Sequence, residues 1–185
     1  MCFEMGLSSF GDNFAWLKRL LAGTMKSLLA GKVSDEVIAE AEEKILPSLA
    51  EAASVLPFRE DAPFASDWFN GRRSPEPNPS LRATVSGLGL ATDAAEVYYA
   101  IVEATAFGVK AMVDTLVDNG VALDSITAIG GIAVKSPFIV QFLADVLGMD
   151  IFVPNLTQAC GLGSAINAAV ASGCWPTLID AQKAM

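Results

Sequence analysis

The segment from Ala94 to Asp118 constrains the fold more than any other part of the sequence. Asp93 precedes it and Glu96 follows three positions later, which is the pattern of a capping box at the start of a helix. Asn119-Gly120 is a typical helix end. Apolar residues fill the segment except for a narrow polar stripe, formed by Glu96, Glu103, Lys110, Asp114 and Asp118. We expect a long helix covered on most of its sides, with Glu96 and Glu103 on its wet face.

Two amphipathic helices are predicted before this long helix. Apolar residues recur at helical spacing over residues 12–28, which predicts the first of them. Ser34 is placed to cap the second, because Asp35 and Glu36 fall in its first turn, where the helix dipole favours negative charge. Pro47 is expected to break or kink this second helix.

Residues 57–81 change character, because prolines recur along them. We expect an irregular crossing there and no helix. Arg72 and Arg73 lie in this stretch. Their guanidinium groups could contact a phosphate through charge-assisted hydrogen bonds, or they could pair with some of the chain's carboxylates. We favour the carboxylates. The tryptophans are expected to pack in the core or at its edge, at positions Trp16, Trp68 and Trp175.

The last third of the chain predicts two units of strand, loop and helix. A short apolar run, Ile126–Ile129, ends directly in Gly130-Gly131 and predicts a buried strand. Ser136-Pro137 then starts a helix that runs to about Leu147. A second strand is expected over residues 150–153 and a helix of small residues over 161–172. This order indicates a parallel strand pair in an α/β layer.

Composition excludes several classes of function. The formal net charge of −9 argues against a nucleic-acid partner. The chain contains no histidine, so no Ser-His-Asp triad, Cys-His pair or zinc site with histidine can form from it. No apolar stretch approaches the length of a membrane span and the start lacks a basic signal sequence. The chain has three widely spaced cysteines, Cys2, Cys160 and Cys174, which favour a reduced, cytoplasmic protein. Cys160 is expected to be a small buried side chain that fills space in the core.

The glycine pair is the clearest chemical feature. Two glycines between a strand and a helix remove side chains where a flat ligand or a phosphate could approach the backbone. They could also serve only a positive-φ turn, and the pattern alone does not separate these alternatives. The loop is not a Walker A motif, because no glycine precedes Lys135, and it lacks the G-x-G-x-x-G spacing of a dinucleotide fold.

Three sequence blocks carry a resemblance to a known family. GGIAVKS, with TDAAEVYYAIVEATAFG before it and QACGLGSAINAAVASG after it, resembles the carboxy-terminal part of FGGY carbohydrate kinases in the same order. The cluster DWFNGRRSPEPNPSLRATVSGLGLATD and the segment SSFGDNFAWLKRLL are similar to the L-ribulokinase branch of that family. The resemblance extends from about Gly6 to Gly173.

The resemblance implies an α/β, actin-like ATPase (ribonuclease H-like) fold, here helix-rich with a small parallel sheet. It implies a nucleotide-side domain over residues 1–185, ATP and Mg²⁺ as cofactors, and phosphorylation of a ribulose-type ketose in arabinose catabolism. Gly131 and Lys135 match positions that contact the adenosine part of the nucleotide, with Gly130 and Ser136 beside them. Gly11 matches a glycine near the nucleotide, whereas Ala15 replaces a polar residue found in some members.

The same resemblance implies what the chain is expected to lack. The sugar-binding amino-terminal domain and the catalytic Asp would precede Met1, so no catalytic or metal-binding residue is assigned here. We expect the chain alone neither to bind ribulose nor to transfer phosphate, and we expect its uncovered apolar faces to favour a homo-oligomer. The alternatives are a non-catalytic helical interaction module and another actin-like ATPase domain.

Overall fold

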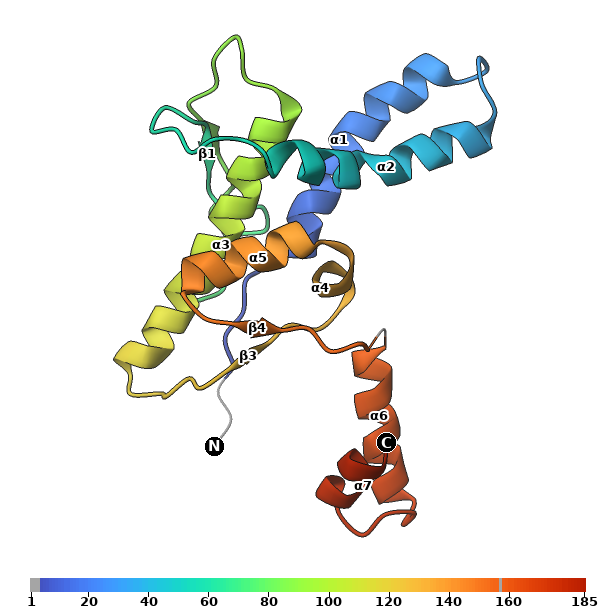
Figure 1. Cartoon of the computed structure of the whole chain (residues 1–185), viewed down its shortest axis with the longest axis vertical. Coiled ribbons are helices and arrows are strands. Elements are labelled where there is room, and N and C mark those ends of the chain that lie inside the picture. Colours follow the sequence, from blue (N-terminus) through green and yellow to red (C-terminus); the bar gives the residue numbers. More distant parts are fainter. Residues whose placement is uncertain (1–3, 157) are drawn as a thin grey trace.

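The computed structural model describes residues 4–156 and 158–185 and consists mainly of helices. Figure 1 shows a central helix crossed by others, with two small sheets at its sides. The helices are α1 (Gly11–Leu29), α2 (Asp35–Ala53), α3 (Ala94–Asp118), α4 (Gly131–Lys135), α5 (Pro137–Leu147), α6 (Ala159–Ala171) and α7 (Leu178–Ala184). The strands are β1 (Phe64–Ala65), β2 (Val85–Ser86), β3 (Ile126–Thr127) and β4 (Ile151–Phe152).

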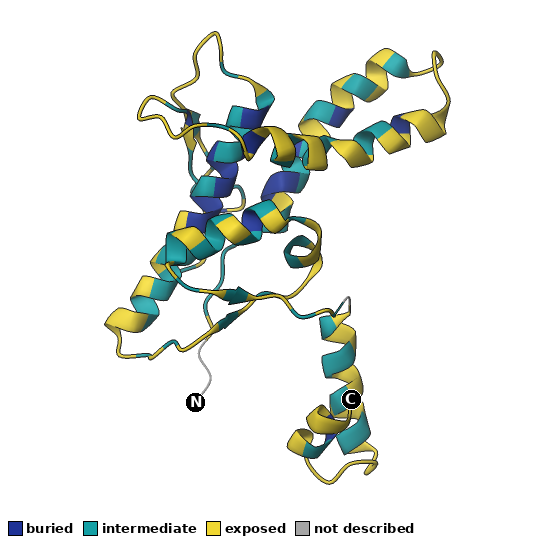
Figure 2. Cartoon of the chain, in the orientation of Figure 1, coloured by how far each residue is buried: buried dark blue, intermediate teal, exposed yellow. Residues whose placement is uncertain are grey.

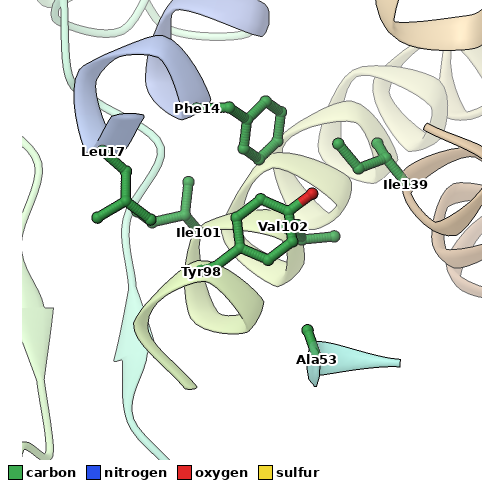
Figure 3. Packing of buried hydrophobic residues seen from close by; sticks show 7 residues of the cluster. All are labelled: Phe14, Leu17, Ala53, Tyr98, Ile101, Val102 and Ile139. Atoms are coloured by element: carbon green, nitrogen blue, oxygen red, sulfur yellow. The ribbon is translucent and has the colours of Figure 1, made fainter. Parts of the chain in front are cut away.

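Helix α3 is the centre of the fold, as its apolar sequence predicts. Its amino-terminal half is buried, and Ile101 is 0% and Tyr98 2% exposed. Phe14 and Leu17 of α1 pack against it from one side and Ile139 of α5 from another. Figure 2 shows the buried residues gathered where these helices cross, and Figure 3 shows their side chains converging on α3. The carboxy-terminal half of α3 is more exposed, so the core covers only the first half of the helix.

The start of α3 confirms the predicted capping box. The carboxylate of Asp93 accepts hydrogen bonds from the amides of Ala95 at 2.9 Å and Glu96 at 3.0 Å. The carboxylate of Glu96 accepts one from the amide of Asp93 at 3.1 Å. Glu96 also pairs with Arg59, with 2.7 Å between Nη2 and Oε1. The capping carboxylates therefore fix both the first turn of α3 and the chain that follows α2.

The prediction of a wet face was wrong for both glutamates. The side chain of Glu96 is only 13% exposed, because it closes the cap and covers Arg59. Glu103 lies half-buried beside a cavity of about 220 Å³ that Tyr99 also lines. Burial raises the pKa of the Glu103 carboxyl. The neighbouring helices and the 57–63 segment cover this side of α3, and the sequence of α3 alone does not reveal them.

Helices α1 and α2 form an antiparallel hairpin against α3. Lys26 bridges the two helices through Glu42, with 2.6 Å between Nζ and Oε2. Ser34 stands at the N-cap of α2, but its side chain makes no capping hydrogen bond. The prediction of a break at Pro47 was wrong, because α2 continues through it to Ala53. Ala53 and Leu49 pack on the core beyond the proline, which stabilises the last turns of the helix.

The proline-rich crossing between α2 and α3 is irregular, as expected, apart from the antiparallel pair β1–β2. Arg72 pairs with Glu76 at 3.2 Å and Arg73 with Glu4 at 2.7 Å, which confirms carboxylate partners for both. Trp16 packs against Phe69 with 4.9 Å between ring centroids. This contact ties the crossing to α1.

The last third confirms the parallel strand pair, since Ile126 of β3 aligns with Ile151 of β4. Both strands are shorter than predicted, and the residues after Gly130 form the additional short helix α4. Helices α6 and α7 pack on each other and project from the rest of the molecule (Figure 1). Cys160 of α6 is exposed, so the prediction of a buried filler was wrong. Cys2 lies outside the described residues.

No helix among residues 4–156 and 158–185 is long and apolar enough to cross a lipid bilayer.

Glu103 predicts a pH-dependent stability. A carboxyl whose pKa is raised by folding binds more protons in the folded state, so stability falls as pH rises from the ordinary value of 4.5 through the folded pKa. Glu103→Gln removes this cost and should stabilise the chain at about pH 7, with no gain at about pH 3, where both states are protonated. Urea unfolding at both values measures it. Glu51→Gln, on the exposed face of α2, removes the same net charge and should not reproduce the effect.

Candidate functional site

The glycine pair forms an open turn between β3 and α4. Gly130 has φ 98° and ψ 179°, a conformation that is essentially restricted to glycine. Gly131 is the first residue of α4, and both glycines are exposed. A methyl group added to either would meet no other atom within 4 Å. The positive φ therefore explains why position 130 is a glycine, whereas neither backbone conformation nor packing explains the glycine at position 131.

The structure brings Gly11 to this loop. A methyl group on Gly11 would lie 2.9 Å from Cδ1 of Ile132, so the first turn of α1 and the start of α4 are in contact. The sequence separation between them is too large for local patterns to reveal this contact. It places Gly11, the glycine of α1 predicted to lie near the nucleotide, beside residues 130–136, which we call the glycine loop.

A buried polar network fixes the first turn of α1. The hydroxyl of Ser9 donates to Oδ1 of Asn13 at 2.5 Å, and Nδ2 of Asn13 donates to the hydroxyl of Thr105 at 3.4 Å. Thr105 in turn donates to the carbonyl of Ile101 at 2.8 Å. Asn13 is fully buried, so its amide must be paired inside the protein. This network was not predicted from the sequence, and an uncharged amide inside an apolar helix face is the signal that could have indicated it.

Lys135 and Ser136 end the loop in different environments. Lys135 is exposed and forms no ion pair with any described residue, so its ammonium group is available to a ligand. The hydroxyl of Ser136 is buried, and it finds no hydrogen-bond partner in the part of the chain that the structure describes. The backbone of Ser136 belongs to the loop, but its hydroxyl is directed into the protein.

A cavity of about 490 Å³ lies beside the loop, between α4, α5 and the chain that leaves β4. Its lining is mainly apolar, with Gln141 and Asn155 as its polar side chains. Ala133 and Val134 of α4 form one wall. This space is a wide, open depression of the surface, and none of the predicted site residues lines it.

A larger cavity, about 560 Å³, lies away from the loop, between the 64–75 segment and α3. Asp67 and Glu103 face it together with Arg72 and Arg73. Burial raises the pKa of the Asp67 carboxyl, and the charge of Arg72 partly opposes this. None of the predicted site residues lies there.

Solved structures of other proteins share the fold of this chain. The chain is similar to a xylulose kinase from Rhodospirillum rubrum, with a TM-score of 0.66 and 24% identity over 95% of this chain and 32% of that one. It is also similar to a glycerol kinase from Plasmodium falciparum solved with ADP, with a TM-score of 0.59 and 22% identity over 85% of this chain and 29% of that one. These likenesses show the fold, which is the actin-like ATPase fold of sugar kinases, as predicted.

Sequence comparison then gives the family. The chain belongs to the FGGY family of carbohydrate kinases, whose C-terminal domain matches residues 1–172. A ribulokinase from Vibrio parahaemolyticus is 40% identical over the whole of this chain and 33% of its own length. The chain thus spans about a third of the curated relatives it matches. Membership in this family confirms the resemblance and excludes the alternative of an unrelated actin-like ATPase.

The two glycines should respond differently to substitution. Gly130→Ala places a side chain at φ 98° and should lower the free energy of unfolding by about 1–3 kcal/mol. Gly131→Ala meets no atom and no positive φ, so the stability should be unchanged or slightly higher. Urea unfolding of both variants measures the difference. Equal losses at the two positions would contradict a turn that requires glycine only at Gly130.

Proposed function

We propose that this chain is the nucleotide-side domain of an ATP-dependent sugar kinase that phosphorylates a ketopentose, converting ribulose to ribulose 5-phosphate. The observation that carries the proposal is the uncovered backbone at Gly131. This glycine serves no turn and no close packing contact, and it lies on the same small helix that meets Gly11. A ligand that approaches the backbone at this point accounts for the missing side chain.

The chemistry of the loop suits the adenosine part of a nucleotide. The exposed backbone of Gly130 and Gly131 offers a flat, unobstructed surface. The ammonium group of Lys135, one turn further on, has no ion-pair partner among the described residues and can reach a ribose hydroxyl or a phosphate. We propose that the nucleotide lies between this loop and the first turn of α1 at Gly11. The glycerol kinase from Plasmodium falciparum was solved with ADP, which supports a nucleotide as the ligand of this fold.

The sugar assignment comes from the relatives. The ribulokinases of Vibrio parahaemolyticus and Bacillus licheniformis are 40% and 38% identical to this chain. We propose ribulose as the substrate on this basis, with a place in the breakdown of arabinose in the cytoplasm. The candidate residues carry no carboxylate, so a base and the sugar pocket must come from other residues of the kinase.

Mg²⁺ is proposed as the partner of the nucleotide phosphates. The ion commonly binds through phosphates, water and one or two carboxylates, without a cage of protein ligands. Among the described residues, no group of three or more His, Cys, Asp or Glu could hold a metal ion. We assign the candidate residues of this chain to the nucleotide and none of them to the metal.

Gly131→Ala tests the nucleotide site. The added methyl group obstructs the approach to the backbone, so we expect ADP affinity to fall by about tenfold or more, equivalent to about 1.4 kcal/mol. The free energy of unfolding should not fall, because the added methyl group meets no atom of the protein and Gly131 has no positive φ. Isothermal titration calorimetry with ADP measures the affinity. Gly163→Ala in α6, whose added methyl also meets no atom, is the matched control and should bind ADP as the parent chain does.

Two outcomes would contradict the proposal. Absence of any ADP or ATP effect on the amides of residues 130–136 would favour the non-catalytic interaction module. Release of ADP that depends on ribulose, from the 185-residue chain alone, would show that the chain supplies the base and the sugar pocket as well. A coupled ADP-release assay with L-ribulose measures this second outcome, and we expect no turnover.

Self-association is proposed for the isolated chain. Large apolar side chains are exposed on several elements, among them Phe152 of β4 at 62% and Ile179 of α7 at 62%. Apolar surface of this kind is typical of an interface. Light scattering over a range of concentrations should detect a dimer or larger species. A monomer at every concentration would overturn this prediction.

A further inference from the structure

Ser136 carries a buried hydroxyl at the end of the glycine loop. Ser136 is both the last residue of the glycine loop and the residue that precedes α5, where a serine usually caps the helix. Its side chain makes no capping hydrogen bond. Within the described part of the chain, its oxygen is buried without a partner. A buried hydroxyl without a hydrogen bond is costly, so a partner close by is expected to engage it in some state of the protein.

Tyr98 of α3 provides that partner. Its ring is held from two sides, by Phe14 with 5.7 Å between ring centroids and by Phe138 with 6.2 Å. The phenol oxygen points toward the side of Ile139 in α5, as Figure 3 shows. Burial raises the pKa of Tyr98, and the adjacent hydroxyl of Ser136 acts in the opposite direction. Phe138, on which Tyr98 stacks, lies two residues after Ser136, so the phenol lies close to the segment that carries the buried hydroxyl; the two hydroxyls form no hydrogen bond of normal geometry in this structure.

The position of this pair matters because the start of the loop is open. A methyl group added to Gly130 or Gly131 would meet no neighbouring atom within 4 Å. Ile132 contacts Gly11 near the amino-terminal end of α4, and Phe138, just beyond its carboxy-terminal end, stacks on Tyr98. Tyr98 cannot move, since it is among the most buried side chains of the core. The two hydroxyls therefore lie at the one end of α4 that Gly11 does not reach.

We propose that Tyr98 is a positioning residue for the nucleotide loop, whose hydroxyl pairs with the hydroxyl of Ser136 and ties the end of the loop to α3 when a nucleotide is bound. Each hydroxyl can both donate and accept, so either one can be the donor of this hydrogen bond. The proposal rests on the proposed nucleotide site. It assigns the Ser136 side chain to the loop's support and leaves ligand contact to its backbone.

The test uses the 185-residue chain with Tyr98→Phe, Ser136→Ala and the double variant. ADP affinity is measured by calorimetry, and hydrogen exchange reports the amides of residues 131–136 with and without ADP. Each single variant should weaken ADP binding by about three- to tenfold, the effect of one hydrogen bond. The double variant should be no weaker than either single one, because both remove the same bond. Amide exchange should rise at residues 131–136 in each of them.

Controls separate positioning from general destabilisation. Tyr99→Phe changes the neighbouring tyrosine, which packs on Phe142 with 5.3 Å between ring centroids, and should leave ADP affinity and loop exchange unchanged. Ser136→Thr keeps a hydroxyl and should bind ADP more tightly than Ser136→Ala. A purely structural role would lower the urea midpoint without a change in ADP affinity or in loop exchange relative to the core.

Two results would overturn the proposal. The first is normal ADP affinity in Tyr98→Phe, and the second is additive loss in the double variant. If the parent chain itself does not bind ADP, the proposed function fails, and the exchange measurement still decides the link. Unchanged exchange at residues 131–136 in Tyr98→Phe would then refute it, whereas faster exchange would support an attachment of the loop to α3 that serves another ligand.

Discussion

The burial of one face of α3 is the interaction on which the rest of the structure depends. Tyr98, Ile101 and Val102 are almost completely removed from water, and they contact α1, the end of α2 and α5 together. Burying a large apolar side chain contributes about 1.5–3 kcal/mol, so these few contacts dominate what holds the helices. The strand pairs contribute little by comparison, because each strand comprises only two residues. The chain is a set of helices assembled on α3.

The candidate site follows from this assembly. The glycine loop is not part of the core, yet both of the elements that meet it are. Helix α1 presents Gly11 to Ile132, and its first turn is fixed by the buried amide of Asn13. Tyr98 of α3 stacks on Phe138, two residues after the end of the loop. The open backbone of the loop is thus held by rigid neighbours. A loop that is held in place before a ligand arrives loses little conformational entropy when the ligand binds.

The regions away from α3 have a different character. Helices α6 and α7 contact mainly each other, and no residue of α6 is buried. The chain corresponds to about a third of its ribulokinase relatives. The chain therefore has one well-packed centre, and large apolar side chains are exposed on the elements around it. Its stability is concentrated at the crossing of α1, α3 and α5, where the candidate nucleotide loop is attached.

Local signals in the sequence determined the ends of the longer helices, such as α3 and α5. The Asp93–Glu96 capping box and Gly148 in the left-handed conformation act within a turn, so their residues specify them directly. The blocks around GGIAVKS determined the family in the same way. Only the tertiary structure decided which distant residues meet. The contact of Gly11 with Ile132, the burial of Glu103 and the inward hydroxyl of Ser136 all depend on how helices pack across the chain, and packing between distant segments leaves no mark on local sequence pattern.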